Sequence, residues 1–110
     1  MSEDLKKLDE YILSISLRDY LENKGQDIGR FIGDFELVNV DAATEGGGAI
    51  NKNTFEQTVL EAKKLLYEKG QKLEAETIVN YRASIGYKGV IYAVYAFGTA
   101  VIHKKEIEKH

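Results

Sequence analysis

Histidines are the residues in this chain best suited to bind a transition metal, and there are only two, His103 and His110. Transition-metal sites use histidine, cysteine and carboxylate ligands. The sequence has no cysteine, so one chain cannot assemble a cage of histidines and thiolates. A ring of chains could bring several copies of His103 together, but a surface histidine at a strand end is the more common outcome. We therefore predict no metal site.

Three consecutive glycines, Gly46, Gly47 and Gly48, stand shortly before an expected helix. Free backbone amides in such a place can bind an anion. The segment lacks the lysine-and-hydroxyl ending of a phosphate loop and the spacing of a dinucleotide fingerprint, and Glu45 would repel a phosphate. A connector is the favoured interpretation. The three glycines remain candidate ligand-binding residues.

Tyrosines gather towards the C-terminal part of the chain. They are Tyr81, Tyr87, Tyr92 and Tyr95. A tyrosine can stack on a planar ligand, and it also suits a subunit interface, where its apolar ring carries a hydroxyl that finds a partner. The interface is the favoured interpretation. Tyr92 and Tyr95 are the candidate ligand-contacting residues.

Nothing in the sequence marks a catalytic centre. The Gly-x-Ser-x-Gly motif is absent, and Ser14, Ser16 and Ser84 have no histidine nearby in sequence. None of the many carboxylates sits in an apolar run, where burial would raise its pKa. We therefore expect no enzyme, no catalytic residue and no cofactor.

Composition narrows the class of protein. The 110 residues, 44% hydrophobic and 30% charged, predict one globular domain. A net charge of −3 gives no basic excess for nucleic acid or anionic lipid. No signal peptide is recognisable, and the apolar C-terminal run is too short to span a membrane as a helix. The absence of cysteine fits a reducing compartment. We expect a cytoplasmic protein without a nucleic-acid or membrane partner.

The N-terminal segment favours helix. Apolar residues at steps of three and four predict an amphipathic helix that starts after Ser2. They are Leu5, Leu8, Ile12 and Ile15. Residues 13–17 also alternate like a strand, so helix and strand both remain open over residues 10–20. Ser16 is a candidate cap for a second short helix, Leu17 to Lys24, which Gly25 would end.

A strand, a loop and a helix are expected next. Residues 35–41 are β-prone, and residues 44–48 predict a flexible loop. Asn53 and Glu56 have the spacing of a capping box for a helix that Gly70 would end in a left-handed cap. The side chains expected to bury this helix form one stripe. They are Phe55, Val59, Ala62 and Leu66.

Two strands complete the pattern. Residues 77–85 predict a strand with Ile78, Asn80 and Arg82 on one face, and residues 86–89 predict a tight turn. The strand that follows is apolar on both faces. One face holds Val90, Tyr92, Val94, Ala96, Ala100 and Ile102, and the other holds Ile91, Ala93, Tyr95, Phe97, Thr99 and Val101. A strand in a small antiparallel sheet normally has one polar face, so we expect a second copy of the chain to cover part of it.

The second half of the chain resembles the YbjQ-type family of heavy-metal-binding proteins over about residues 54–104. Residues 73–79, Leu-Glu-Ala-Glu-Thr-Ile-Val, look like the family's Leu-Gly-Ala-Asp-Ala-Ile-Val entry into a strand. Residues 98–101, Gly-Thr-Ala-Val, look like its closing motif. Glu74 stands where the family has glycine. The resemblance implies a small dodecin-like α+β fold whose members form rings.

We therefore predict an α+β fold with an N-terminal helical segment, then β-α-β-β with an antiparallel sheet and one helix on a face. Residues 1–110 would form a single domain: segment 1–32, core 33–104 and a frayed tail 105–110. The expected function is non-enzymatic self-assembly into a homo-oligomer, as a scaffold or ligand-holding ring. Alternatives are a small-ligand or metal binder at a subunit interface, its ligand unknown, and an adaptor that docks a partner through the N-terminal helix.

Overall fold

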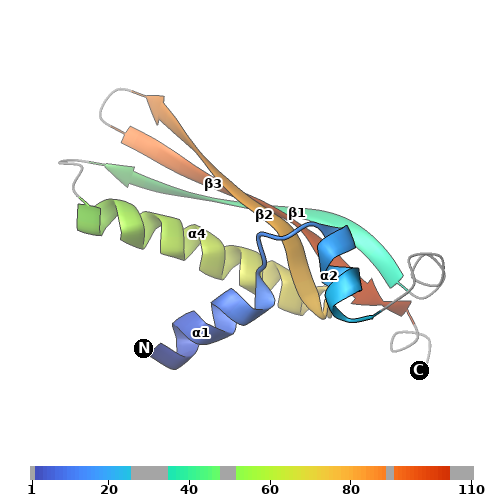
Figure 1. Cartoon of the computed structure of the whole chain (residues 1–110). Coiled ribbons are helices and arrows are strands. Elements are labelled where there is room, and N and C mark those ends of the chain that lie inside the picture. The colour runs from blue at the N-terminus through green and yellow to red at the C-terminus, as the bar shows by residue number, and fades with distance from the viewer. Residues whose placement is uncertain (1, 26–34, 48–51, 89–90, 105–110) are drawn as a thin grey trace.

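The computed structural model describes residues 2–25, 35–47, 52–88 and 91–104 (Figure 1). Two helices come first, followed by a β-α-β-β unit. The elements are α1 (Ser2–Tyr11), α2 (Leu17–Asn23), β1 (Phe35–Gly47), α4 (Lys52–Lys72), β2 (Thr77–Lys88) and β3 (Ile91–His103). The predicted α+β architecture is confirmed. No helix in these ranges is both long and apolar enough to cross a membrane.

The sheet is antiparallel and open, with strand order β1-β3-β2. Its outer strands are longer than predicted, since the ladder runs through the glycines expected in loops. Gly46 pairs with Tyr92, and Gly86 pairs with Ala93. The predicted loop at 44–48 is therefore wrong up to Gly47, as is the turn at 86–89 up to Lys88. Gly48 and residues 89–90 lie outside the described residues.

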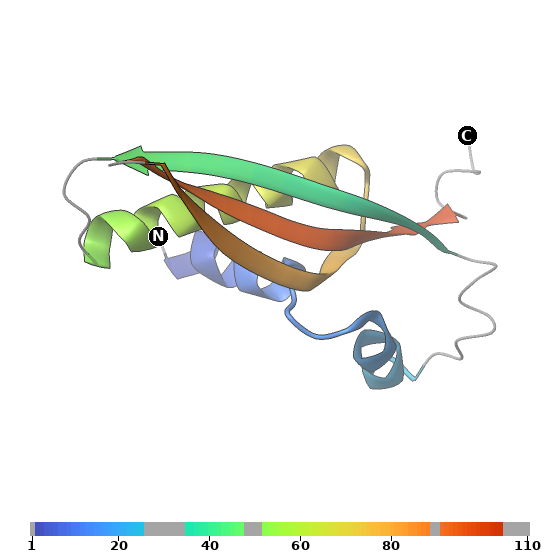
Figure 2. The ribbon, with the colours of Figure 1, turned by 90° about the horizontal axis from the view of Figure 1, so that it is seen from above.

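The main core lies between the sheet and helices α4 and α1, which share one side of it (Figures 1 and 2). Ala62 and Leu66 of α4 are fully buried, at 0% exposure, while Phe55 and Val59 are half-buried at the margin. The face of β3 that these helices cover is one of the two predicted sets. Its buried members are Tyr92, Val94, Ala96, Ala100 and Ile102.

Both predicted ends of α4 need correction. The helix begins at Lys52, so Asn53 lies in its first turn rather than before it. At the other end Gly70 is helical, and Glu74 takes the left-handed position with a φ of 59°. The Ala75 N–H donates to the Gly70 carbonyl and the Glu74 N–H donates to the Gln71 carbonyl, both at 3.0 Å. This is a Schellman motif, which satisfies the last carbonyls of the helix.

A β-bulge interrupts the pairing of β2 with β3. Val79 pairs with Thr99 and Arg82 with Phe97, so two residues of β2 oppose Gly98 alone. The first of these two, Asn80, has a φ of 58°. An extra residue reverses the side-chain alternation. The prediction that Ile78 and Arg82 share a face is therefore wrong.

The N-terminal segment combines the two readings that the sequence left open. Helix α1 ends at Tyr11, and an extended stretch then runs along the edge of β2, with a parallel bridge between Ile12 and Ile78. Backbone hydrogen bonds of 2.8–3.0 Å tie Leu13 and Ile15 to β2. Helix α2 starts where predicted, because the Ser16 side chain accepts a hydrogen bond from the Asp19 amide at 3.1 Å.

Candidate functional site

One face of the sheet is only partly covered. Helix α2 packs on one end of it, where Tyr20 and Leu21 bury Val79 and Val101. Beyond α2, large apolar side chains of β3 are left outside, with Ile91 50%, Tyr95 41% and Phe97 38% exposed. We call the uncovered surface the open face. It comprises Leu37, Asn39, Asp41, Ala43, Glu45, Arg82, Ser84, Ile91, Ala93, Tyr95, Phe97 and Thr99.

A polar hollow of about 630 Å³ lies on the open face beside the extended N-terminal stretch. Its lining includes Ser14, Asn39, Asp41, Asn80, Arg82, Phe97 and Thr99. The Thr99 hydroxyl donates to Asn39 Oδ1 at 3.2 Å, which fixes these two side chains across the β1–β3 pair. The hollow thus offers amides, hydroxyls, one cation, one anion and an aromatic ring.

The charges of the open face stand on either side of its aromatic centre. Arg82 and Asp41 both pair in register with Phe97, so the three side chains form a row across the sheet. Within the described residues Arg82 makes no ion pair. Asp41 Oδ1 lies 3.8 Å from Lys69 Nζ at the β1 edge, and the Asp41 side chain is 78% exposed. The row therefore presents a cation, an apolar ring and an anion.

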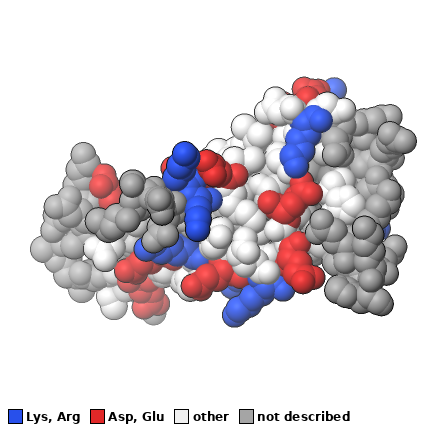
Figure 3. Space-filling model, turned by 90° about the horizontal axis from the view of Figure 1, so that it is seen from below, with Lys and Arg blue, Asp and Glu red and all other residues white. Residues whose placement is uncertain are grey.

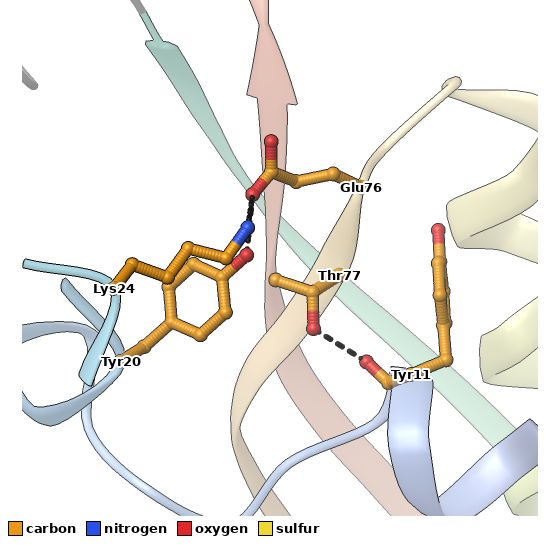
Figure 4. A network of polar contacts seen from close by, with 5 residues as sticks. All are labelled: Tyr11, Tyr20, Lys24, Glu76 and Thr77. Atoms are coloured by element: carbon orange, nitrogen blue, oxygen red, sulfur yellow. Dashed lines mark hydrogen bonds and ion pairs between the residues drawn. The ribbon is translucent and has the colours of Figure 1, made fainter.

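A polar cluster anchors α2 at the border of the open face (Figure 4). The Tyr20 hydroxyl donates to Glu76 Oε2, and Lys24 Nζ donates to the same oxygen at 2.9 Å. Burial, and then the hydrogen bond to Glu76, raises the pKa of Tyr20. The hydrogen bonds to Tyr20 and Glu76 raise the pKa of Lys24. The cluster thus holds α2 beside Glu76, the residue that precedes β2.

A second pair of hydrogen bonds fixes the end of α1. The Thr77 hydroxyl donates to the Tyr11 carbonyl at 2.7 Å (Figure 4), and the Tyr11 hydroxyl donates to the Ala75 carbonyl at 2.6 Å. Burial, followed by the nearby Tyr67, raises the pKa of Tyr11 to about 12. The N-terminal segment is therefore bound to the α4–β2 junction at two points.

The structure brings only some of the predicted ligand-binding residues together. Gly46 and Gly47 lie in β1, where Gly46 adjoins the ring of Tyr92. Tyr92 is buried on the helix side, with its hydroxyl 3.1 Å from Thr58 Oγ1, whereas Tyr95 points out of the open face. Gly48 lies outside the described residues. Ligand binding by these residues remains a prediction.

No group of three or more histidine, cysteine, aspartate or glutamate side chains arranged to hold a metal occurs among the described residues. His103 ends β3 as predicted, and its ring stands edge-on to Phe35 at a centroid distance of 4.6 Å. Its Nδ1 is buried, with no hydrogen-bond partner among the described residues. His110 lies beyond them.

The sequence pattern does not predict the charged members of the open face. Simple alternation puts Arg82 on the face of Ile78, because it takes no account of the bulge, and the β-prone pattern marks Asp41 only as the end of a strand. Asn80 carried a usable signal, since asparagine is enriched at left-handed backbone positions. An asparagine inside a β-prone run was thus a hint of the bulge.

The opposite side of the molecule, which α1 and α4 cover, carries charged side chains of both signs (Figure 3). Basic and acidic side chains are interspersed on it, with no broad region of one sign among the residues drawn in colour. One pair bridges the two helices, with Lys63 Nζ 2.9 Å from Asp9 Oδ1. This side has the mixed charge of an ordinary solvated surface.

Comparison with solved structures finds a similar fold. A crystal structure of a protein of unknown function from Pediococcus pentosaceus, which belongs to the DUF74 family, matches with a TM-score of 0.60. The two chains are 18% identical, and the match covers 84% of this chain and 96% of that one. DUF74 is the YbjQ-like family. At this identity the likeness shows the fold alone.

A scan against protein-family models finds no match. A search of curated proteins finds no relative either.

Proposed function

We propose that this chain is a YbjQ-type protein that works by self-assembly, as a non-enzymatic homo-oligomer joined through the open face. The observation that carries the proposal is the exposure of Ile91, Tyr95 and Phe97 on a strand whose other face is already core. A helix-covered antiparallel sheet normally turns a polar face to water. Burying these side chains between copies would gain about 25 cal/mol for each Å² of apolar surface.

The arrangement of the open face supports an interface between proteins. Apolar rings occupy the central strand, while Asp41 and Arg82 stand on the outer strands. An apolar centre with a polar rim is the usual anatomy of a protein–protein interface. The likeness to the DUF74 structure supports the family assignment but does not bear on assembly.

A second candidate is the binding of a small polar ligand at such an interface. The hollow of about 630 Å³ favours it, because Arg82, Asn39 and Asn80 converge there beside the ring of Phe97. A pocket of this size with a few converging polar groups is typical of small-molecule sites. A scaffold and a ligand-holding oligomer are therefore compatible uses of the same surface.

The adaptor alternative has less support. It needs an apolar stripe on α1 that is free for a partner, but Leu8 and Ile12 are buried in the main core. Leu5 is the large apolar residue of this stripe that stays exposed, at 44%.

Native mass spectrometry tests the proposal, because it reports subunit count and bound small molecules together. We expect an oligomer from the wild type and a folded, smaller species from Tyr95→Glu. Leu5→Glu is the matched control, since it places the same charge on an equally exposed apolar position away from the open face. A wild-type monomer, or equal dissociation by both variants, would contradict the proposal. A co-purifying compound would favour the ligand-holding form.

A further inference from the structure

The polar hollow on the open face is built from a single chain. All three strands and the extended N-terminal stretch contribute to its lining, and Gly98, which has no side chain, lines it with backbone. Its volume of about 630 Å³ lies in the range of small-molecule sites. The hollow is therefore complete in one copy of the chain, whether or not copies assemble.

Hydrogen-bond donors predominate among the polar groups of the hollow. Arg82 and Asn80 line it, and neither side chain makes a hydrogen bond or an ion pair with another described residue. The Thr99 hydroxyl donates to Asn39 Oδ1 at 3.2 Å, so the Asn39 amide keeps its NH2 group for a ligand. A guanidinium binds a carboxylate through two parallel hydrogen bonds. The hollow thus favours a ligand whose carboxylate lies at Arg82.

The row across the sheet determines the rest of the ligand. Arg82 and Asp41 both pair in register with Phe97 and lie on opposite sides of it, two strand spacings or about 10 Å apart. The Phe97 side chain is 38% exposed and offers a ring on which a second ring can stack. Asp41 accepts hydrogen bonds and repels a second negative charge. The complement of this row is a carboxylate, a ring and a hydrogen-bond donor, in that order.

We infer that the hollow binds a small aromatic carboxylate that carries a hydrogen-bond donor at the far end of its ring. The inference rests on the ligand-binding candidate among the proposed functions and names the class of ligand. The carboxylate pairs with Arg82, the ring stacks on Phe97 and the donor binds Asp41. Lys69 lies 3.8 Å from Asp41 Oδ1 at the β1 edge, so a neutral aryl amine or hydroxyl fits this end better than a second cation.

Isothermal titration calorimetry with para-aminobenzoate and benzoate tests the inference. The wild type should bind both at millimolar concentrations, and para-aminobenzoate about three- to tenfold more tightly, because its amine alone donates to Asp41. Arg82→Gln should weaken the binding of both probes at least about tenfold, since the charge-assisted hydrogen bonds are lost. Asp41→Ala should abolish the preference between the probes. Arg18→Gln is the control, because Arg18 is an exposed arginine of α2 that does not line the hollow.

Three results would overturn the inference. They are the absence of saturable binding by the wild type, equal losses in Arg82→Gln and Arg18→Gln, and inorganic phosphate that binds as tightly as para-aminobenzoate. Circular dichroism first establishes that each variant is folded. Arg82→Lys is the second variant at this position and should bind with intermediate affinity, because it keeps the charge but loses the planar fork.

Sedimentation of the same samples separates this inference from the proposed self-assembly. A monomer that binds the probes with the expected preference supports the inference and contradicts self-assembly. An oligomer that binds neither probe overturns the inference alone.

Discussion

The side chain of Ile78 fills the space that a Cβ atom at Gly98 would occupy. An ideal Cβ at Gly98 would lie 2.4 Å from Ile78 Cγ2 and 3.3 Å from the Val79 carbonyl oxygen. The contact sits opposite the bulge at Asn80, where β2 supplies two residues against one of β3. Because Gly98 has no side chain, the bulged part of β2 can pack close to β3. The bulge shifts the side-chain alternation of β2, which places Arg82 on the open face.

Gly98→Ala should destabilise the fold by about 1–3 kcal/mol, because the added methyl group overlaps a fully buried side chain and nearby backbone. Denaturant unfolding measures the loss. Gly86→Ala is the control within the same sheet, since its Cβ would meet only the partly exposed Tyr95 ring, at 3.3 Å. If the two variants lose the same free energy of unfolding, the close contact between Gly98 and Ile78 is not what makes a side chain at Gly98 unfavourable.

Glu74→Gly should stabilise the protein by about 1 kcal/mol, because a left-handed backbone strains residues that carry a Cβ. Glycine, which the YbjQ-type motif has at this position, adopts this conformation without strain. Glu68→Gly, on the exposed face of α4, should lose about 1 kcal/mol of stability instead. If thermal unfolding shows the two substitutions to be equally harmful, the Schellman assignment is wrong.

Local signals in the sequence were sufficient for much of the fold. Ser16 marked the start of α2, and the stripe containing Ala62 and Leu66 identified the face of α4 that is buried. Alternation along β3 separated the core residue Val94 from the outward Tyr95. In each case the decisive contacts are either close in sequence or follow the period of one element.

The rest depends on contacts that are distant in sequence. Gly46 and Gly86 look like loop residues, but pairing with β3 keeps them in strands. The alternating stretch before Ser16 becomes extended because the edge of β2 offers it hydrogen-bond partners. The position of Arg82 depends on a bulge that forms only opposite Gly98. The hollow and its charged row were therefore beyond single-sequence reasoning.

Leu66→Asp should unfold the subunit, because the new carboxylate would be buried without a partner at a side chain that is 0% exposed. Loss of the circular dichroism signal and of the melting transition measures this. Leu65→Asp is the adjacent control at 39% exposure and should leave the fold intact. Native helix content in Leu66→Asp would mean that α4 packs on the sheet through another face.

Stability should fall as the pH rises above about 10, where an unfolded tyrosine loses its proton. The pKa of Tyr11 is raised to about 12, so its contribution is complete below the unfolded value and is lost as the pH approaches the folded one. The ionised hydroxyl can no longer donate to the Ala75 carbonyl. The pKa values of Tyr20, Tyr81 and Lys24 are also raised, and these groups act in the same direction.

Tyr11→Phe isolates this contribution. The variant should be less stable by about 1 kcal/mol at neutral pH, where the hydrogen bond is lost. Its free energy of unfolding should then decline less steeply than that of the wild type between about pH 10 and pH 12. Parallel declines in the two proteins would show that Tyr11 does not titrate as the structure implies.

Sedimentation velocity of the wild-type chain over a range of concentrations tests self-assembly through the open face most directly. We expect a closed oligomer at roughly 50 micromolar, which is orders of magnitude above a nanomolar dissociation constant. We also expect Tyr95→Glu to shift the protein to a folded species that sediments more slowly. A wild type that sediments as a monomer at that concentration would contradict self-assembly through the open face, and Ile91, Tyr95 and Phe97 would then be exposed for another reason.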